Sequence, residues 1–194
     1  MAISSTRPQA LPPLRRVLIV GGGGREQALA WALSRNGTIT TVWIAPGNGG
    51  PEGQAIEIAE TDSDALVAFC RQKNVDLVVV GPEAPLAAGV ADALRSADIA
   101  VFGPDAAGAQ LEASKAWAKQ LMQDAAVPTA GHWSVHSEDE ALAVLHKVNR
   151  PLVVKADGLA AGKGVTVADT VAEAEAAIRE AFQGRFGDAG SNLV

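Results

Sequence analysis

The chain has 194 residues and is 48% hydrophobic, which is enough to bury one large core or two small ones. Its formal net charge is −6 and it has no basic stripe, which argues against nucleic acid as the main partner. No run reaches the roughly 18 apolar residues of a membrane helix, and the single cysteine, Cys70, permits no internal disulfide, so we expect a cytoplasmic protein with no membrane partner.

The start of the chain predicts a βαβ unit. Residues 1–15 are rich in Pro, Ser and Arg and have no apolar stretch, which predicts a flexible extension rather than a secretory signal. Residues 16–20, in which Arg16 leads into four consecutive apolar residues, predict a strand buried on both faces of a parallel sheet. Four glycines then lead into a helix over 25–33. Free N–H groups at a helix N-terminus favour an anion, so the candidate ligand-binding residues here are Gly22, Gly23, Gly24 and Arg25.

This glycine run does not fit a dinucleotide-binding fingerprint. The G-x-G-x-x-G pattern, started at Gly21 or Gly22, ends on Glu26 or Gln27, and no acidic residue follows the second expected strand, 41–45. A monophosphate or another small anion fits the glycines equally well. A tight turn that binds no ligand is the structural alternative.

Similar strand–helix units follow along the chain. We expect strands at 55–58, 76–80 and 100–102 and helices at 62–73 and 86–96. The loops that follow successive strands would meet at the carboxyl edge of the sheet, where open α/β folds bind ligands. They add Asn48, Gly81, Pro82 and Glu83 to the candidate site. Glu83 would bind an amine or a hydroxyl, or would cap the following helix.

The second half of the chain predicts a smaller α+β lobe. Ser114 is expected to cap a helix over 115–122, and residues 127–130, which include a proline, predict a linker. A strand around 132–136 should follow, and then two helices that start at capping boxes, Ser137–Glu140 and Thr170–Glu173. We therefore expect a Rossmann-like domain with a linking helix at 16–126 and a smaller lobe at 127–194. The three histidines do not have the spacing of a metal site.

A glycine-rich hairpin carries the most chemistry in this lobe. An apolar run, 152–154, ends in Lys155, and a second run lies at 165–167. Between them lie Gly158, Gly162, Lys163 and Gly164, whose small size and charge suit a flap over a polyphosphate. The segment does not match a Walker A loop or the glycine-rich loop of protein kinases. An ordinary surface hairpin is the structural alternative.

Five segments together resemble the phosphoribosylamine–glycine ligases, also called glycinamide ribonucleotide synthetases, of the ATP-grasp superfamily. The resemblance spans about residues 16–194 in the same order, and it is carried by residues 20–26, 46–48, 80–86, 111–115 and 154–165. It implies an α/β fold, in which a Rossmann-like (pre-ATP-grasp) parallel sheet domain precedes the small α+β ATP-grasp lobe.

The resemblance also implies an activity. ATP, 5-phosphoribosylamine and glycine would give glycinamide ribonucleotide, ADP and phosphate through glycyl phosphate, in de novo purine biosynthesis. Lys115, Lys155 and the loop from Gly158 to Gly164, with Gly162 and Lys163, match ATP-contacting positions. The glycine-rich edge of the first domain would help to hold phosphoribosylamine.

One departure from the family qualifies this expectation. The Mg²⁺ ligands, the adenine-binding hinge and the glycine-binding residues are expected beyond residue 194. We therefore expect a truncated, monomeric chain with no metal ligands of its own and no ligase activity alone. Another ATP-grasp carboxylate–amine ligase, or a non-catalytic fragment that binds a nucleotide or a sugar phosphate, remain the alternatives.

Overall fold

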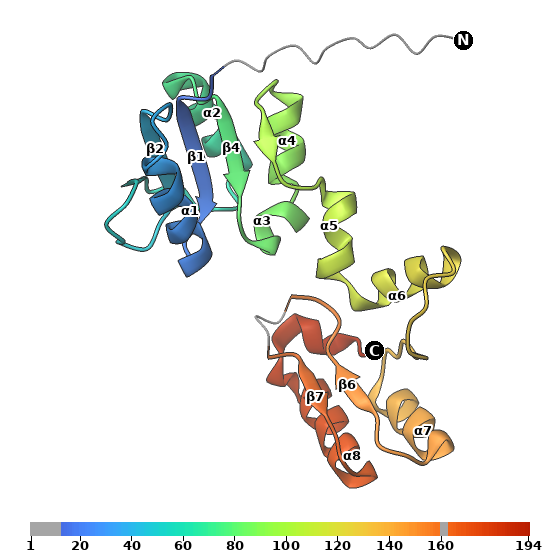
Figure 1. Ribbon diagram of the computed structural model, residues 1–194. Helices are drawn as coiled ribbons and strands as arrows, with labels where there is room; N and C mark the ends of the chain where they lie inside the picture. The colour runs from blue at the N-terminus through green and yellow to red at the C-terminus, as the bar shows by residue number, and fades with distance from the viewer. Residues whose placement is uncertain (1–12, 160–162) are drawn as a thin grey trace, which may run out of the picture. The chain divides into compact units, whose positions relative to one another are not determined.

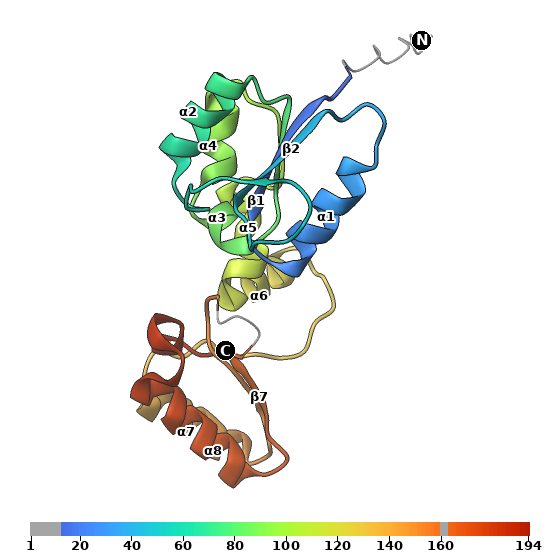
Figure 2. The same cartoon turned by 90° about the vertical axis from the view of Figure 1, so that its left-hand side faces the viewer.

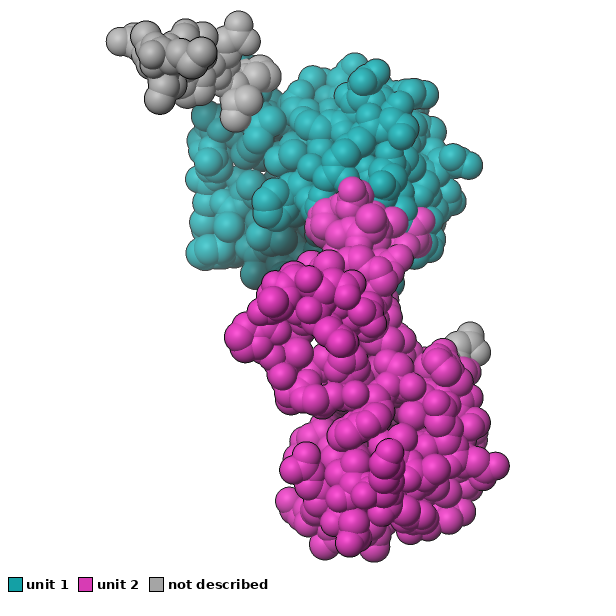
Figure 3. All heavy atoms as spheres, turned by 90° about the vertical axis from the view of Figure 1, so that its right-hand side faces the viewer, with its two compact units in different colours: residues 1–85, 89–103 teal, residues 86–88, 104–194 magenta. Residues whose placement is uncertain are grey.

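The computed structural model describes residues 13–159 and 163–194, and the chain divides into two compact units, coloured separately in Figure 3. Within the described ranges, the first unit comprises residues 13–85 and 89–103, and the second comprises 86–88 and 104–194. The boundary expected after residue 126 falls inside the second unit. Most of the expected N-terminal extension lies outside the described residues.

The first unit is built on a parallel sheet, as the sequence predicted (Figure 1). Its strands run in the spatial order β3-β2-β1-β4-β5. Their bounds are β1 Arg16–Gly21, β2 Thr41–Pro46, β3 Gln54–Ala55, β4 Leu77–Val80 and β5 Val101–Phe102. Residues 17–20 of the central strand β1 are completely buried, because both faces of the sheet are covered by helices.

Figure 2 shows α1 on one face of this sheet and α2 with α4 on the other. The helices are α1 Gly24–Ser34, α2 Ser63–Lys73, α3 Glu83–Ala87 and α4 Val90–Ser96. The expectation of one helix over 86–96 was wrong. Gly89 has a left-handed backbone (φ 84°), which separates α3 from α4 and which few other residues would tolerate.

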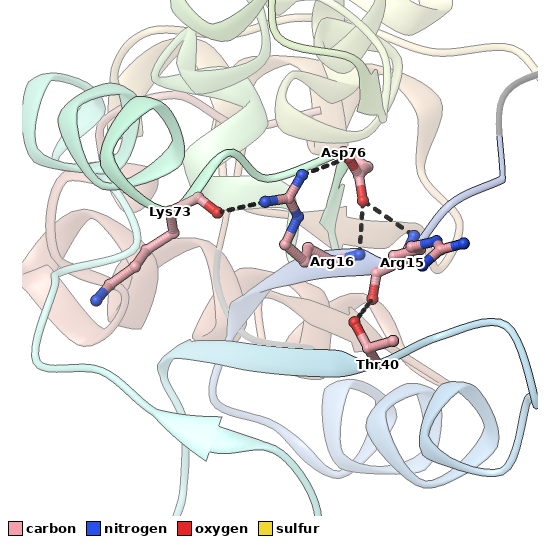
Figure 4. A network of polar contacts seen from close by, with 5 residues as sticks. All are labelled: Arg15, Arg16, Thr40, Lys73 and Asp76. Carbon is pink, nitrogen blue, oxygen red and sulfur yellow. Dashed lines mark hydrogen bonds and ion pairs between the residues drawn. The ribbon is translucent and has the colours of Figure 1, made fainter.

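The starts of β1 and β4 are joined by one carboxylate (Figure 4). Asp76 accepts hydrogen bonds from the backbone N–H groups of Arg15 (2.9 Å) and Arg16 (2.7 Å), and the Arg16 guanidinium lies 3.3 Å away. Thr40 donates its hydroxyl to the Arg15 carbonyl, which adds β2 to the same contact. The three strands therefore enter the sheet at a fixed register.

The second unit contains helices and one antiparallel hairpin. The elements are α5 Ala106–Ala113, α6 Lys115–Asp124, α7 Glu138–Val148, β6 Val153–Lys155, β7 Val165–Val167 and α8 Val171–Glu180, followed by a π-helical turn, Ala181–Arg185, and a 3₁₀ turn, Gly187–Ser191. Ser114, Ser137 and Thr170 each cap the helix that follows them, as expected. Helices α7 and α8 cover one face of the hairpin, with Leu145, Val154 and Ile178 in the core.

The strand expected around 132–136 does not form. Only Val135 is paired, through two backbone hydrogen bonds with Leu193 of 2.9 and 3.0 Å. Val135 is also the one buried member of this segment, since its neighbours are exposed or partly exposed. A strand needs a continuous partner, and here a single residue meets one.

No helix within the described ranges is both long enough and apolar enough to cross a membrane.

Candidate functional site

The order in which successive strands are added to the sheet reverses between β1 and β4, although all the strands are parallel. From β1 it proceeds to β2 and β3 on one side, and then to β4 and β5 on the other. The carboxyl ends of β1 and β4, at Gly21 and Gly81, therefore lie at a topological switch point, where open α/β sheets bind their ligands. The loops predicted to form one crevice do meet at this edge.

A buried glutamate occupies this switch point. Glu26 is 3% exposed, its Oε2 accepts a 2.7 Å hydrogen bond from the Gly23 N–H, and its Oε1 accepts one of 3.1 Å from Arg25 Nε. Glu26 was not among the site residues predicted from the sequence. Its place three residues after the helix cap, where a glutamate often accepts from the cap N–H, was the available signal.

The buried side chain of Glu26 leaves no room for a Cβ at three nearby glycines, two in the glycine run and one after β4. A Cβ added to Gly81 would lie 2.0 Å from Glu26 Oε1, one added to Gly23 would lie 2.6 Å from Oε2, and one added to Gly21 would lie 2.7 Å from Cγ. A Cβ on Gly24, by contrast, would meet nothing within 4 Å. Part of the glycine run thus makes room for a carboxylate, and Gly24 faces open space.

Arg25 links two acidic residues at the same edge. Its guanidinium contacts Glu26 and also lies 3.5 Å from Glu83 Oε1. The hydrogen bond to Glu26 raises the pKa of Arg25 and burial opposes this, while the nearby charges of Glu26 and Glu83 raise it further. Two carboxylates around one guanidinium leave the edge net negative. Such an edge suits hydroxyl or amine donors better than a phosphate.

The loop after β2 forms the rim of this edge. Asn48 Nδ2 donates to the Gly23 carbonyl (3.3 Å), and Asn48 Oδ1 accepts from the Gly50 N–H (3.0 Å). An open hollow of about 470 Å³ lies between this loop and α1. It is lined by Gly24, Gln27, Ala28, Trp31, Asn48, Gly49, Gly50, Pro51 and Glu52. Pro82 packs against Gly21 across the switch point: a Cβ added to Gly21 would lie 2.7 Å from Pro82 Cδ.

The second unit presents an apolar hairpin face with a lysine on it. In the β6–β7 register, Val153 pairs with Val167 and Lys155 pairs with Val165, so these four side chains share one face. This face is not covered by the helices: Val165 is 45% exposed and Val167 is 71% exposed. Within the described residues, the Lys155 ammonium group has no hydrogen bond or ion pair.

The root of the glycine-rich loop is held by hydrogen bonds. The Ala156 N–H donates to the Gly164 carbonyl (2.7 Å), and Lys115 Nζ donates to the Gly158 carbonyl (2.9 Å). Lys163 is exposed at the returning side of the loop. Gly162 lies outside the described residues.

A cavity of about 420 Å³ lies beside β6 within the second unit. Val153, Val194 and Trp133 provide an apolar wall, and Lys155 and Arg150 add positive charge. A pocket with an apolar wall and a few cations suits a ligand with a flat apolar part and an anionic part.

A Rossmann-like unit followed by a small α+β unit with a lysine-bearing, glycine-rich hairpin defines the ATP-grasp class of proteins. Two family models match the chain. Residues 15–112 match phosphoribosylglycinamide synthetase, N domain, and residues 113–194 match phosphoribosylglycinamide synthetase, ATP-grasp (A) domain. The chain belongs to the phosphoribosylglycinamide synthetase family, which confirms the resemblance drawn from its motifs.

Individual relatives agree with this assignment. The chain is 48% identical over 184 residues to the phosphoribosylamine–glycine ligase of Escherichia coli O6:H1, and the match covers 92% of this chain and 43% of the relative. It is 48% identical over 180 residues to the enzyme of Mesorhizobium japonicum, with 92% and 42% covered. The chain thus spans less than half the length of these curated relatives.

Solved structures support the same fold. The crystal structure of phosphoribosylamine–glycine ligase from Thermotoga maritima aligns with a TM-score of 0.71 and 28% identity, over 92% of this chain and 42% of that one. A biotin carboxylase from Campylobacter jejuni aligns with a TM-score of 0.66 over 93% and 44%, at 18% identity. At that identity, the second likeness concerns the fold alone.

Proposed function

We propose that the chain supplies the substrate edge and the phosphate-binding hairpin of a phosphoribosylamine–glycine ligase. The observation that carries this proposal is the exposed face of β6 and β7, where the Lys155 ammonium stands among Val153, Val165 and Val167. An unpaired cation on an apolar, solvent-facing sheet fits a ligand that is apolar on one side and anionic on the other. A nucleoside triphosphate has this character.

In the proposed reaction, ATP phosphorylates the carboxylate of glycine, and the amine of phosphoribosylamine then attacks the glycyl phosphate. The phosphoryl transfer step depends on positioning and on charge neutralisation. Lys155 and Lys115 would stabilise the negative charge that moves between the phosphates and the carboxylate. Lys163 would approach from the returning side of the glycine-rich loop.

The edge of the first unit would bind the sugar amine. Its net negative charge, from Glu26 and Glu83 around Arg25, favours the ribose hydroxyls and the amine as donors. The Gly23 N–H already donates to Glu26 and is therefore not free to bind a phosphate. In this proposal, Gly24, Asn48 and the 470 Å³ hollow receive the sugar rather than its phosphate.

ATP-grasp enzymes use ATP with Mg²⁺. Among the described residues, no group of three or more His, Cys, Asp or Glu side chains could hold a metal ion. The place of the Mg²⁺ ligands, expected beyond residue 194, stays a prediction.

Nucleotide binding tests the proposal directly. In a calorimetric titration of ATP into the chain, the heat of binding should reach saturation. Lys155→Ala should weaken the affinity for ATP about tenfold, because one charge-assisted contact is lost. Lys147→Ala, which removes an exposed helical lysine of the same unit, is the matched control and should change nothing. Equal affinities of Lys155→Ala and the unmodified chain would contradict the assignment of the hairpin face.

The cytoplasmic location and the monomeric state remain predictions. Light scattering of the purified chain, with and without ATP, checks the second. A stable dimer would contradict it.

A further inference from the structure

A single carboxylate fastens the glycine-rich hairpin to the start of α6. Asp157 Oδ1 accepts hydrogen bonds from the backbone N–H groups of Lys115 (2.6 Å) and Ala116 (3.2 Å). Its Oδ2 accepts the hydroxyl of Ser114 at 3.2 Å. The Ser114 oxygen in turn accepts from the Trp117 N–H, so this hydroxyl both caps the helix and holds the hairpin. Negative charge at this position is also favoured by the helix dipole.

The residue that follows Asp157 makes the complementary contact. Lys115 Nζ donates to the Gly158 carbonyl at 2.9 Å. The Asp157 N–H donates to the Asn192 carbonyl at 2.8 Å, which fixes the peptide on the N-terminal side of Asp157. Gly158 has φ 119°, and a Cβ there would lie 3.2 Å from the Cβ of Ala189. The entry of the loop is therefore anchored to α6 and to the turn that precedes the C-terminal residues.

These contacts couple a side chain to a loop. Lys115 contributes its backbone N–H to Asp157 and its ammonium group to Gly158, so the position of its side chain and the position of the loop entry depend on each other. If Asp157 released the helix N-terminus, the Gly158 carbonyl would no longer be held within reach of Lys115 Nζ. A carboxylate with three donors on it is not replaced easily by water.

We propose that Asp157 is a positioning residue that locks the entry of the glycine-rich loop to the N-terminus of α6 and thereby places the Lys115 ammonium group. The last step, that Lys115 so placed contacts the phosphates of ATP, rests on the proposed function. The lock itself does not, because it is a property of the chain without nucleotide. The two parts can therefore be tested separately.

The lock is tested by the accessibility of one amine. The chain is treated with a limiting amount of an amine-acylating reagent, and the rate of modification of each lysine is followed by mass spectrometry. In Asp157→Ala, Lys115 should be acylated several times faster than in the unmodified chain, relative to the exposed Lys147. Amide hydrogen exchange of residues 155–159 and 163–167 should also become faster. Asp157→Asn, which keeps one acceptor oxygen and loses the charge, should lie between the two.

A matched variant separates the lock from helix capping. Asp105 caps α5 in the same unit through a 2.7 Å bond from the Gly108 N–H, and no hydrogen bond or ion pair joins it to the described residues of the hairpin. Asp105→Ala should leave the acylation of Lys115 unchanged. If Asp157→Ala fails to fold, the Asp157→Asn and Ser114→Ala variants provide the same readout. An unchanged Lys115 rate in every folded variant at positions 114 and 157 would overturn the proposal.

ATP binding provides the second arm. Asp157→Ala should weaken the affinity for ATP about tenfold, and Asp105→Ala should not. If the unmodified chain binds no ATP while the acylation results hold, the proposed function fails and the lock stands. If ATP binds and the acylation rates do not differ, the lock fails and the proposed function stands.

Discussion

Glu26 and Gly81 fit together so closely that a Cβ at position 81 would displace the Glu26 carboxylate. A Cβ there would lie 2.0 Å from Glu26 Oε1, which is well inside van der Waals contact, and Glu26 is buried and held by the Gly23 N–H. The carboxyl end of β4 and the first turn of α1 are thus shaped for each other across the switch point.

Gly81→Ala should therefore destabilise the first unit by about 1–3 kcal/mol, the usual cost of overpacking. Gly24→Ala is the control from the same edge: its Cβ meets nothing within 4 Å, and in the first turn of α1 alanine should be neutral or slightly stabilising. Hydrogen exchange of the β1 amides measures the effect in this unit alone. A fully tolerated Gly81→Ala would show that Glu26 moves aside at little cost.

Asp76 makes the stability of the first unit depend on pH in the acidic range. Burial raises the pKa of Asp76. The hydrogen bonds from the N–H groups of Arg15 and Arg16 and the charge of the Arg16 guanidinium lower it by more, so the pKa lies below its ordinary value. A lowered pKa stabilises the fold above the pKa of the unfolded chain, about 3.9, and this contribution is lost as the pH falls through the folded value.

Asp76→Asn should accordingly cost about 1–2 kcal/mol at pH 7, because it weakens charge-assisted bonds to the start of β1. The difference between the variant and the unmodified chain should stay constant down to about pH 5 and then shrink as the pH falls below about 4. The measurement is the exchange-derived stability of β1 as a function of pH. A difference that does not change over this range would contradict the role of the charge.

Cys70 should be inert in the folded chain. Burial raises the pKa of its thiol to about 11, so very little thiolate is present at pH 8. Iodoacetamide should label Cys70 in urea but not in the native chain. Since the unfolded thiol ionises near pH 8.5, the folded state should lose stability from that pH upward, and Cys70→Ala should remove this part of the slope. Rapid labelling of the native chain would contradict the burial.

The two faces of the hairpin should respond differently to one substitution. Val167→Thr and Val165→Thr, on the exposed face, should change the unfolding free energy by less than about 0.5 kcal/mol yet weaken ATP binding measurably. Val154→Thr, on the buried face, should cost about 1–3 kcal/mol because its hydroxyl is desolvated. Denaturant unfolding and ATP titration on the same samples provide both numbers. An unaffected ATP affinity in both exposed-face variants would argue against a nucleotide on that face.

The sheet and the hairpin were predictable because buried strands appear in sequence as short apolar runs. Residues 17–20 and 77–80 are such runs, and Lys155 followed by glycines indicated the hairpin. The break at Gly89 was missed because a helical pattern resumes directly after it. The strand expected at 132–136 was wrong because alternation alone does not reveal whether a partner strand is present.

The carboxylates that organise the two sites were less accessible to sequence reasoning. Glu26 had a local signal, its place three residues after the helix cap, which was overlooked. Asp157 accepts from backbone N–H groups of a distant helix, and such donors leave no mark in the residue types around it. Asp157 finds its partners 41 to 43 residues earlier in the chain, a distance that no local motif spans. The roles of the candidate residues for ATP and sugar binding remain predictions.

The long separation between Asp76 and the start of β1 has a consequence for the synthesis of the chain. β1 pairs with β2 on one edge, but its other edge and its N-terminal anchor wait for β4, and Asp76 follows Arg16 by 60 residues. At the usual pace of ribosomes, this interval lasts roughly 3 to 12 s. For that time the central strand of the sheet has an open edge, which is the kind of segment that chaperones shield at the ribosome exit.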